Sequence, residues 1–395
     1  MRKNALLIFG GKSFEHDISI ITALIMLNKA SSCKYNLLPV YITKNDEWFF
    51  YAKDKLDIKM FKDFYNNYKA NGFKSAYLRI GNNNLFVKTG MLEKKIEVSC
   101  ALNCCHGGKG ENGGLTALLE SCNIPVSSGS ALGLGVCMDK VMSKYIFKSL
   151  KVPVIQSFSF TKEEFKEDRE QILKNLKKLD FPVILKPSTL GSSIGIEVVK
   201  NMGDFEKQAL VALEFDNTIL VEKAILDDMK ECNVACLKVD GKTVVSGIDM
   251  PKRRDEILSF NDKYNSKGYF KGSCEKLDRK NCLAKDSKTS KLNIEEKKLI
   301  STLPDKVTKQ IIEISKKVYE KLMLFGPVRI DFILDKKNKV FLNEINTVPG
   351  SLAYYFFVPY IYKGVDKFIE AILDNAIIEF NSKVKVKKEY ITNLI

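Results

Sequence analysis

The sequence predicts an α/β fold at its N-terminal end that continues into α+β segments. Three observations predict it. Short apolar runs alternate with helical stretches over residues 1–130, glycine-rich turns follow two of those runs, and a pair of strands near the C-terminal end carries polar residues between apolar ones. Strands that alternate with helices are typical of a parallel sheet covered by helices, whereas two strands joined by a short polar turn form a hairpin.

Residues 1–130 form the first expected domain. Its expected strands are Ala5–Phe9, Tyr35–Ile42 and Val98–Asn103, and its expected helices are Ile18–Asn28 and Leu115–Cys122. Residues 45–97 are less regular and include a hairpin near Gly81–Gly90. The first apolar run has no small-residue cleavage site and runs directly into a glycine turn. We therefore interpret it as a buried strand rather than a signal peptide.

Residues 131–218 and 219–395 form the second and third expected domains. In the second we expect helices at Asp139–Leu150 and Asn201–Leu213, and strands at Pro182–Lys186 and Gly195–Val199. In the third we expect a helix at Pro304–Leu324 and strands at Ile219–Glu222, Cys232–Lys238, Thr243–Ile248, Val328–Leu334 and Val340–Glu344. Residues 262–300 are polar without a clear period, which indicates a long surface loop. The basic tail after Asn381 is expected to be peripheral.

The composition is that of a soluble globular protein. The 395 residues are 45% hydrophobic and 28% charged, and no apolar stretch approaches the about 18 residues that a membrane-spanning helix needs. The ten cysteines are scattered without a C-x-x-C pair, which favours a reducing cytoplasm. The formal net charge of +15 is spread along the chain. We attribute it to lysine-rich composition and a site for a polyanionic nucleotide, not to nucleic-acid binding.

Two glycine-dense turns follow expected strands. The first is Gly10–Ser13, followed by Glu15-His16-Asp17, and the second is His106–Gly114. The acidic residues suit either a substrate amine or the capping of a helix start. Both histidines of the chain lie in these turns. Because ligands bind beyond the carboxyl ends of parallel strands, this placement favours a functional role.

A lysine followed by small residues indicates a phosphate site in the second domain. Lys186 ends an expected strand, and Gly191, Ser192, Ser193 and Gly195 follow it. Lysine supplies a point charge for phosphate, and a loop of small residues can close over it. A plain hairpin would leave the four small residues unexplained.

The C-terminal hairpin carries the strongest signal. Asp331, Glu344 and Asn346 alternate with apolar residues on adjacent expected strands, so they can point to one face. Three oxygen donors with Arg329 nearby suit Mg2+ that bridges nucleotide phosphates. The alternative is a solvated sheet face with an Arg329–Asp331 ion pair. The apolar neighbours favour a buried site, where unpartnered carboxylates are costly.

Taken in order, these segments resemble the D-alanine–D-alanine ligases of the ATP-grasp superfamily. The resemblance covers nearly the whole chain and includes 10–19, 106–114, Met138-Asp139-Lys140, 186–195, Leu220–Lys223 and 329–350. It implies an ATP-grasp architecture with an N-terminal parallel-sheet domain, a small central lid domain and a C-terminal mixed-sheet domain. It also implies ATP-dependent ligation of two D-amino acids through an acyl phosphate, for peptidoglycan precursors. The family precedent is a homodimer.

The resemblance implies roles at the substrate end. Glu15 would orient the first substrate's amino group and hydrogen-bond toward Ser192 and Tyr264. His106 would contact that substrate near its carboxylate. Lys263 and Tyr264 match the family's lid pair.

At the nucleotide end, the resemblance implies that Lys140, Lys186 and the loop with Ser192 and Ser193 contact the phosphates of ATP. It implies that Glu222 and Lys223 contact the adenine, and that Glu231 contacts the ribose. Asp331, Glu344 and Asn346 would ligate two Mg2+ ions, with Mn2+ as an alternative. Arg329 and the backbone N–H of Gly350 would stabilise the tetrahedral transition state. Positioning and charge neutralisation are what phosphoryl transfer needs most.

The sequence departs from the family after Gly350. There the family has a small polar stretch whose serine holds the second substrate's carboxylate, but this chain has Ser351-Leu352-Ala353-Tyr354-Tyr355-Phe356-Phe357. The alternatives are therefore D-Ala + D-Ala ligation and ligation of a different acceptor amine. A third hypothesis is a non-catalytic nucleotide-binding regulator, which the intact metal ligands oppose. Lesser departures are Asn112, where the family usually has aspartate, and the long basic loop after Tyr264.

Overall fold

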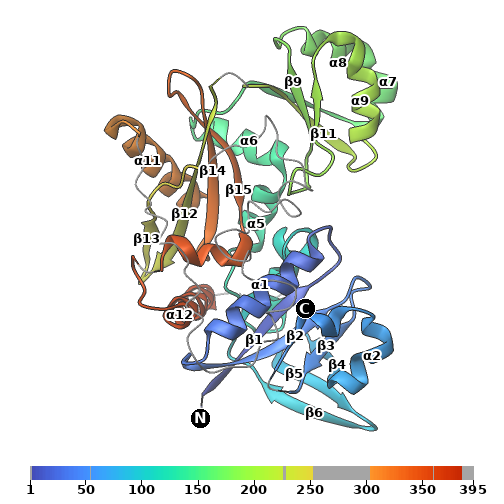
Figure 1. Cartoon of the computed structure of the whole chain (residues 1–395), viewed down its shortest axis with the longest axis vertical. Coiled ribbons are helices and arrows are strands. Elements are labelled where there is room, and N and C mark those ends of the chain that lie inside the picture. The colour runs from blue at the N-terminus through green and yellow to red at the C-terminus, as the bar shows by residue number, and fades with distance from the viewer. Residues whose placement is uncertain (1, 54, 226–227, 252–302, 359, 385–395) are drawn as a thin grey trace, which may run out of the picture.

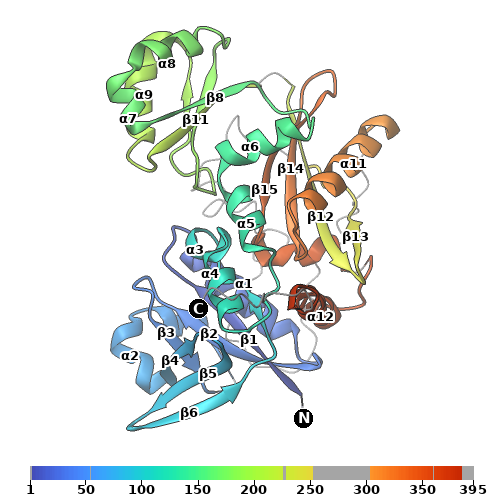
Figure 2. The ribbon, with the colours of Figure 1, turned by 180° about the vertical axis from the view of Figure 1, so that it is seen from behind.

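The computed structural model describes residues 2–53, 55–225, 228–251, 303–358 and 360–384. Lys263, Tyr264, the loop at 262–300 and the end of the basic tail lie outside these residues. The described residues form three β-sheets, and the ribbon shows three bodies placed around a central junction (Figure 1). Figure 2 shows α5 and α6 running from the N-terminal body up between the other two.

The N-terminal sheet has seven strands in the order β6-β5-β4-β3-β2-β1-β7. They are β1 Lys3–Gly10, β2 Tyr35–Ile42, β3 Trp48–Tyr51, β4 Phe73–Arg79, β5 Asn82–Thr89, β6 Leu92–Glu97 and β7 Cys100–Asn103. β1 runs parallel to β2 and β7, as predicted, and the remaining pairs are antiparallel. The turns at Gly81 and Gly90 have φ +75° and +65°, which glycine adopts without steric cost. The sequence predicted one hairpin there, and the structure has two.

Helices cover both faces of this sheet. The helices of the segment are α1 His16–Lys29, η1 Ile58–Phe61, α2 Phe64–Asn71, α3 Gly108–Glu111 and α4 Gly114–Ser121. Alternate residues of β1 divide between two cores: Leu7 packs with α1 and the C-terminal helix, and Leu6 packs with Leu115 and Leu119 of α4. This two-sided burial is the reason that the β1 sequence is almost continuously apolar.

The central sheet has four antiparallel strands in the order β10-β9-β11-β8. Its elements are β8 Ser157–Thr161, α7 Lys162–Glu167, α8 Arg169–Leu176, β9 Val183–Pro187, β10 Glu197–Val199, η2 Met202–Asp204, α9 Phe205–Ala212 and β11 Thr218–Lys223. One face packs against α7, α8 and α9 through Leu185, Val221 and their neighbours. The opposite face carries Lys186 and Glu222, which the alternation of side chains along a strand places together.

The C-terminal sheet has four antiparallel strands in the order β13-β12-β14-β15. They are β12 Lys230–Val239, β13 Lys242–Val245, β14 Val328–Leu334 and β15 Val340–Asn346. A mixed sheet was expected here, but the described strands are all antiparallel. One face packs on α5 Ala131–Met138, α6 Lys140–Ser149 and α11 Asp305–Lys321. The domain boundaries at 130/131 and 218/219 stay predictions.

Two C-terminal elements were not anticipated. η3 Gly350–Phe356 follows β15, and α12 Val365–Val384 crosses back to the N-terminal sheet. Phe368, Ile369 and Ile372 of α12 join the core that contains β1 and α1. Asp374 also accepts hydrogen bonds from Lys34 Nζ and the Tyr35 hydroxyl. The C-terminal helix α12 thus covers part of the core beside the N-terminal sheet.

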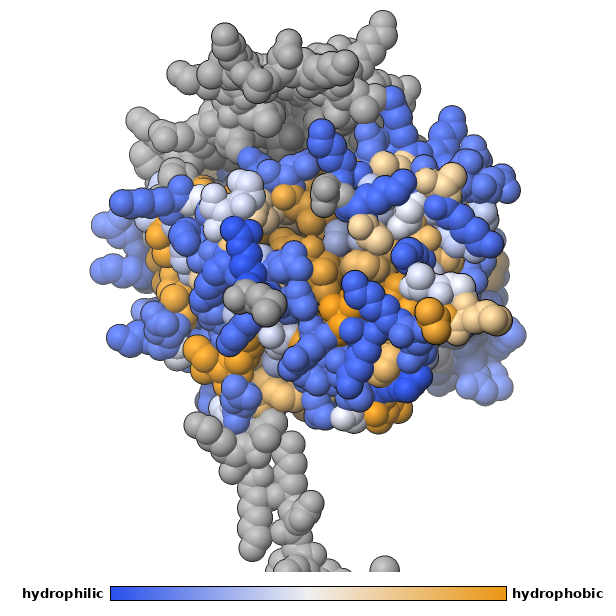
Figure 3. All heavy atoms as spheres, turned by 90° about the horizontal axis from the view of Figure 1, so that it is seen from below, coloured by the Kyte–Doolittle hydropathy of each residue, from blue (hydrophilic) through white to orange (hydrophobic). Residues whose placement is uncertain are grey.

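One face of the molecule shows how polar and apolar side chains are distributed on the surface. Seen from below, hydrophilic side chains cover most of the face, and apolar side chains lie among them (Figure 3). Within the described ranges, no helix has the length and apolarity to cross a membrane. The eight described cysteines are all buried and free, including Cys104 and Cys105.

Candidate functional site

The polar face of the C-terminal sheet gathers the residues predicted to bind metal. In the register of β14 and β15, Asp331 stands opposite Glu344, and Arg329 stands opposite Asn346. Opposite residues in a ladder share a face. Ile330, Phe332 and Ile345 point to the other face and are buried in the core. The predicted common face of Asp331, Glu344 and Asn346 is therefore confirmed by the register.

A β-bulge adds one more side chain to this face. The register between the two strands shifts between Asp331 and Phe332, so that Phe332 pairs with Leu342 and Asn343 is the extra residue. A bulge redirects a side chain that strict alternation would send elsewhere. Asn343 Oδ1 accepts a hydrogen bond from Lys186 Nζ at 3.2 Å. This contact joins the central sheet to the C-terminal sheet.

Arg329 and Asp331 form a fork within one strand. Arg329 Nε donates to Asp331 Oδ1 and Nη2 donates to Oδ2, both at 2.7 Å. Asn346 Nδ2 donates to Asp331 Oδ2 at 3.0 Å. The side chains of Arg329 and Asp331 are 19% and 15% exposed. The carboxylate is thus held in one orientation at a half-buried position.

The chemistry of this donor set fits a hard cation. Asp331 and Glu344 offer carboxylate oxygens, and Asn346 offers an amide oxygen. Mg2+ prefers six oxygen ligands and usually takes several from substrate phosphates and water. In the described part of the chain, no three His, Cys, Asp or Glu side chains gather into a metal site. With Asp331, Glu344 and Asn346 the protein would supply part of the shell, and a bound nucleotide would supply the rest.

A buried ion triad lies on the facing central sheet. The Glu222 carboxylate is ion-paired with both Lys186 and Lys144. Glu222 is 1% exposed and Lys144 is 4% exposed. Burial acts to raise the pKa of Glu222, but Lys186 and Lys144 outweigh it and bring that pKa to about 2. Burial also opposes the charge of Lys186, yet Glu222 raises the pKa of this lysine above its usual value. The triad places positive charge where the predicted phosphate site lies.

Lys140 anchors the loop of small residues. Its Nζ donates to the carbonyl of Leu190, and its backbone N–H donates to Ser188 O at 2.9 Å. Burial lowers the pKa of Lys140, and nearby Glu344 partly offsets that effect. Ser192 and Ser193 have φ +54° and +59°, a left-handed conformation that non-glycine residues adopt at a cost. The loop is thus held against the start of α6 by Lys140.

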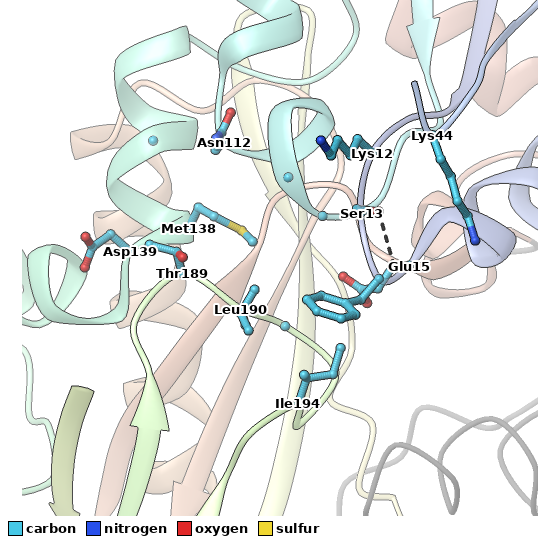
Figure 4. Close-up of a pocket in the computed structure, with 15 residues that line it drawn as sticks. Lys12, Ser13, Glu15, Lys44, Asn112, Met138, Asp139, Thr189, Leu190 and Ile194 are labelled. Carbon is cyan, nitrogen blue, oxygen red and sulfur yellow. Dashed lines mark hydrogen bonds between the residues drawn. The ribbon is translucent and has the colours of Figure 1, made fainter. Parts of the chain in front are cut away.

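Glu15 meets this loop from the N-terminal body. Ser192 Oγ donates to Glu15 Oε1, as the family resemblance implied, whereas the other implied partner, Tyr264, lies outside the described residues. A cavity of about 730 Å³ lies beside this contact, lined by the turns at 12–15 and 107–112, the end of α5 and the loop at 189–194. Met138 and Leu190 point into it, whereas Asp139 points away (Figure 4). Asp139 instead caps α6 by accepting from Val141 N and Met142 N.

His106 is buried with both ring nitrogens bonded to the protein. Nδ1 lies 2.7 Å from Val348 O and Nε2 lies 2.8 Å from Thr22 Oγ1. A carbonyl only accepts, so Nδ1 carries the proton and Nε2 accepts from the threonine hydroxyl. Thr22 Oγ1 in turn accepts from the N–H of Ser351 at 3.3 Å. Burial lowers the pKa of His106, which suits this neutral form. Contact with a substrate stays a prediction.

Glu111 lies in the same turn. Its Oε1 accepts from the N–H groups of Thr347 and Val348 at 3.0 and 3.2 Å, and its Oε2 accepts from Gly107 N at 2.9 Å. Burial raises the pKa of Glu111 to about 7, nearby Glu15 adds to the rise, and the three N–H groups oppose it.

The chain after Gly350 makes a left-handed turn. Ser351, Leu352 and Ala353 have φ 52°, 52° and 51°, and each such non-glycine residue costs about 1–2 kcal/mol. The aromatic run then turns into the core: Tyr354, Phe356 and Phe357 are 4%, 1% and 0% exposed. Tyr355 alone of this run is only half-buried. The aromatic rings that the sequence placed at the second substrate's position are therefore largely core residues.

Three further predicted residues, Lys223, Glu231 and Gly350, complete the predicted set. Lys223 Nζ pairs with Asp180 at 2.5 Å, and its side chain is 42% exposed. Glu231 stands opposite Ile333, on the polar face of the C-terminal sheet. Gly350 begins η3, and no atom lies within 4 Å of the position that a Cβ would take there. The adenine, ribose and oxyanion roles of these residues stay predictions.

Sequence reasoning missed Lys144, Glu111, Thr22 and Asn343. Lys144 had a signal, because it lies four residues after Lys140 on a predicted helix and residues at that spacing share a face. Glu111 lies inside the glycine turn that was singled out. No local pattern in the sequence pointed to Thr22 or Asn343. The partners of Thr22 come from distant segments, and Asn343 faces Lys186 because of the β-bulge.

Comparison with known proteins adds independent findings. Family models described as the D-ala D-ala ligase N-terminus and C-terminus match residues 4–129 and residues 146–282 and 277–373. The chain is 32% identical to the D-alanine–D-alanine ligase of Thermosipho africanus, over 89% of this chain and 87% of that one. It is also 32% identical to the ligase of Thermosipho melanesiensis, over 98% and 99%.

Solved structures share the fold. A D-alanine–D-alanine ligase from Helicobacter pylori has a TM-score of 0.70 at 24% identity and covers 95% of this chain and 98% of its own. The ligase from Coxiella burnetii has a TM-score of 0.75 at 22% identity, over 98% and 97%. The VanG D-Ala:D-Ser ligase from Enterococcus faecalis has a TM-score of 0.71 at 22% identity, over 96% and 100%.

Proposed function

The chain belongs to the D-alanine–D-alanine ligase family, and from this premise we propose that it joins two D-alanines at the expense of ATP for peptidoglycan precursor synthesis. The observation that carries the proposal is the facing pair of charged surfaces. Asp331, Glu344 and Asn346 share one sheet face, and Lys186 links that face to the cationic triad of the other sheet through Asn343. A nucleoside triphosphate with its divalent cation is the ligand that complements both charged surfaces.

The phosphate end of the site explains how the chain would use ATP. Lys186 and Lys140 supply positive charge, and the loop at 188–195 covers the phosphates. Asp331, Glu344 and Asn346 would hold Mg2+, which when bound neutralises phosphate charge and orients the terminal phosphoryl group. We assign two ions by family precedent, with Mn2+ as an alternative. Glu222, Lys223 and Glu231 stay assigned to the adenine and ribose.

The substrate end explains the ligation. Glu15, held by Ser192, would fix the ammonium group of the first D-alanine so that its carboxylate faces the terminal phosphate. The carboxylate oxygen attacks phosphorus, ADP leaves, and an acyl phosphate forms. The second amine then attacks the acyl carbon and expels phosphate. Arg329 and the Gly350 N–H would stabilise the oxyanion of that step, while Lys263 and Tyr264 stay assigned to the lid.

A second candidate differs only in the acceptor. The Enterococcus faecalis structure with this fold is a D-Ala:D-Ser ligase, so the fold accommodates more than one acceptor. In this chain the left-handed turn at 351–353 buries most of the aromatic run and leaves Tyr355 half-buried. A different acceptor amino acid is therefore the alternative to D-alanine. The buried, free cysteines favour a reducing cytoplasm, and a homodimer stays a prediction from the family.

Phosphate release with ATP and Mg2+ tests the proposal. We expect release with D-alanine alone, and D-alanyl-D-alanine as the product by mass spectrometry. Release that needs D-serine or another amine in addition to D-alanine supports the second candidate. ATP binding without turnover for any amino acid of either configuration contradicts both.

A further inference from the structure

Glu111 is a buried carboxylate to which the proposed reaction gives no role. Its side chain is 8% exposed. Its hydrogen-bond partners in the described ranges are backbone amides and the Thr347 hydroxyl rather than a cation. Burying a charge without a cation is costly unless several donors satisfy it. The hydrogen bonds that Glu111 accepts are therefore what stabilises its carboxylate in the buried position.

These contacts cross from the N-terminal body to the end of β15. Oε2 accepts from Gly107 in the glycine turn, while Oε1 accepts from Thr347 N and Val348 N. Thr347 directly follows Asn346, and Val348 lies two residues before Gly350. The glutamate thus joins the turn to the segment between a proposed metal ligand and a proposed oxyanion donor.

His106 and Thr22 hold the same segment at further points. His106 Nδ1 donates to Val348 O, and Thr22 Oγ1 accepts from Ser351 N. Both backbone polar groups of Val348 are consequently bonded to side chains of the N-terminal body. The left-handed residues 351–353 follow at once. Such a conformation persists only where its surroundings fix it, and these three side chains provide that fixation.

We propose that Glu111, with His106 and Thr22, forms a clamp that positions residues 347–351, and so sets the place of the Gly350 N–H and of the Asn346 amide. Glu111 is the central positioning residue of this clamp. The inference rests on the proposed function, because only in that reaction do the Gly350 N–H and the Asn346 amide need a fixed position. It also means that the body that receives the first substrate fixes the oxyanion donor of the other body.

Three variants test the clamp. Glu111→Ala removes all of its acceptors. Glu111→Gln keeps a carbonyl oxygen for Thr347 and Val348 but turns its NH2 toward the Gly107 N–H. We expect kcat to fall about 10- to 100-fold in Glu111→Ala and to be partly rescued in Glu111→Gln, with the dissociation constant for ATP within twofold of wild type in both. Thr22→Val removes the acceptor for Ser351 and lowers kcat in the same way.

Hydrogen–deuterium exchange of residues 346–353 gives a readout that does not need turnover. We expect faster exchange of the Thr347, Val348 and Ser351 amides in Glu111→Ala, and no change in Glu120→Gln. Glu120 makes a matched control, because this glutamate of the same body pairs at 2.8 Å with Lys383 of α12, a contact away from residues 347–351 and more open to solvent. If Glu111→Ala does not fold, Glu111→Gln and Thr22→Val carry the same measurement.

The outcomes separate the two proposals. Unchanged amide exchange in the Glu111 and Thr22 variants overturns the clamp, as does a kcat loss matched by an equal loss of ATP affinity. A wild-type protein that releases no phosphate with any amino acid overturns the proposed function, whereas amide exchange still decides whether the clamp exists.

Discussion

Arg329 and Asp331, two residues apart on β14, are joined by two parallel hydrogen bonds of 2.7 Å each. The fork fixes both the guanidinium and the carboxylate on the face where Glu344 and Asn346 also lie. One geometry thereby serves two proposed tasks, since the arginine would stabilise the oxyanion and the aspartate would hold the metal.

The fork predicts that lysine cannot replace Arg329. Lysine keeps the charge but lacks the planar pair of donors, so Arg329→Lys frees the Asp331 carboxylate and moves the charge from the oxyanion. We expect kcat to fall about 100-fold, measured as phosphate release at saturating ATP and D-alanine. Arg169→Lys is the control, because Arg169 pairs with Glu206 on the exposed surface and such pairs contribute little. Turnover within twofold of wild type in Arg329→Lys would count against the oxyanion role.

The donor set predicts a metal-specific defect in Glu344→Gln. The amide keeps the size of the side chain but loses the negative charge that a divalent cation needs. We expect kcat/KM for ATP to fall about 100-fold and the dependence on Mg2+ concentration to shift to higher values, while the fold survives. Glu313→Gln on the exposed face of α11 should leave both unchanged. Unchanged turnover in Glu344→Gln would sink the metal assignment.

The ion triad predicts that Lys144 supports ATP use without touching the phosphates. In Lys144→Met, Glu222 keeps Lys186 as its partner in the triad and draws that lysine toward itself. We expect a higher KM for ATP and a loss of about 2 kcal/mol in the free energy of unfolding, because the buried Glu222 carboxylate loses one of its two charged hydrogen-bond donors. Urea unfolding and steady-state kinetics measure the two effects. Lys148→Met, one turn along the same helix and exposed, should show neither, and a Lys144 variant that matched it would refute the role.

The same triad predicts an acid-sensitive contribution to stability. The pKa of Glu222 is about 2 in the folded protein, against an ordinary value of 4.5. As the pH falls from 4.5 toward 2, the unfolded chain takes up the proton first, so unfolding becomes easier. Above pH 4.5 the contribution is fully present.

Urea unfolding between pH 7 and pH 3 checks this contribution. We expect Glu222→Gln to be less stable than wild type at pH 7 and to lose less stability on acidification. Glu170→Gln, at an exposed helix pair with Lys174, should keep the full wild-type slope. An equally steep loss in Glu222→Gln would show that other groups cause the acid sensitivity.

The sequence by itself determined the elements and the identity of the main charged residues. Periodicity placed β1, β2, β14 and β15 almost at their observed bounds, because local alternation of apolar residues reports the faces of a strand. The same alternation put Asp331, Glu344 and Asn346 on one face. The glycine turns and the small-residue loop were visible because backbone freedom and small side chains are local properties.

Only the tertiary structure decided which distant groups meet. The Lys144–Glu222–Lys186 triad joins three segments. The Glu111 clamp spans 236 residues between Glu111 and Thr347, and the C-terminal helix α12 packs into the core of the N-terminal sheet. The aromatic run after Gly350 was expected beside the second substrate, yet the left-handed turn at 351–353 sends most of it into the core. Contacts of this kind depend on packing between elements, which no local pattern encodes. The sequence therefore predicted the chemistry of the site, and the fold decided how that chemistry is held in place.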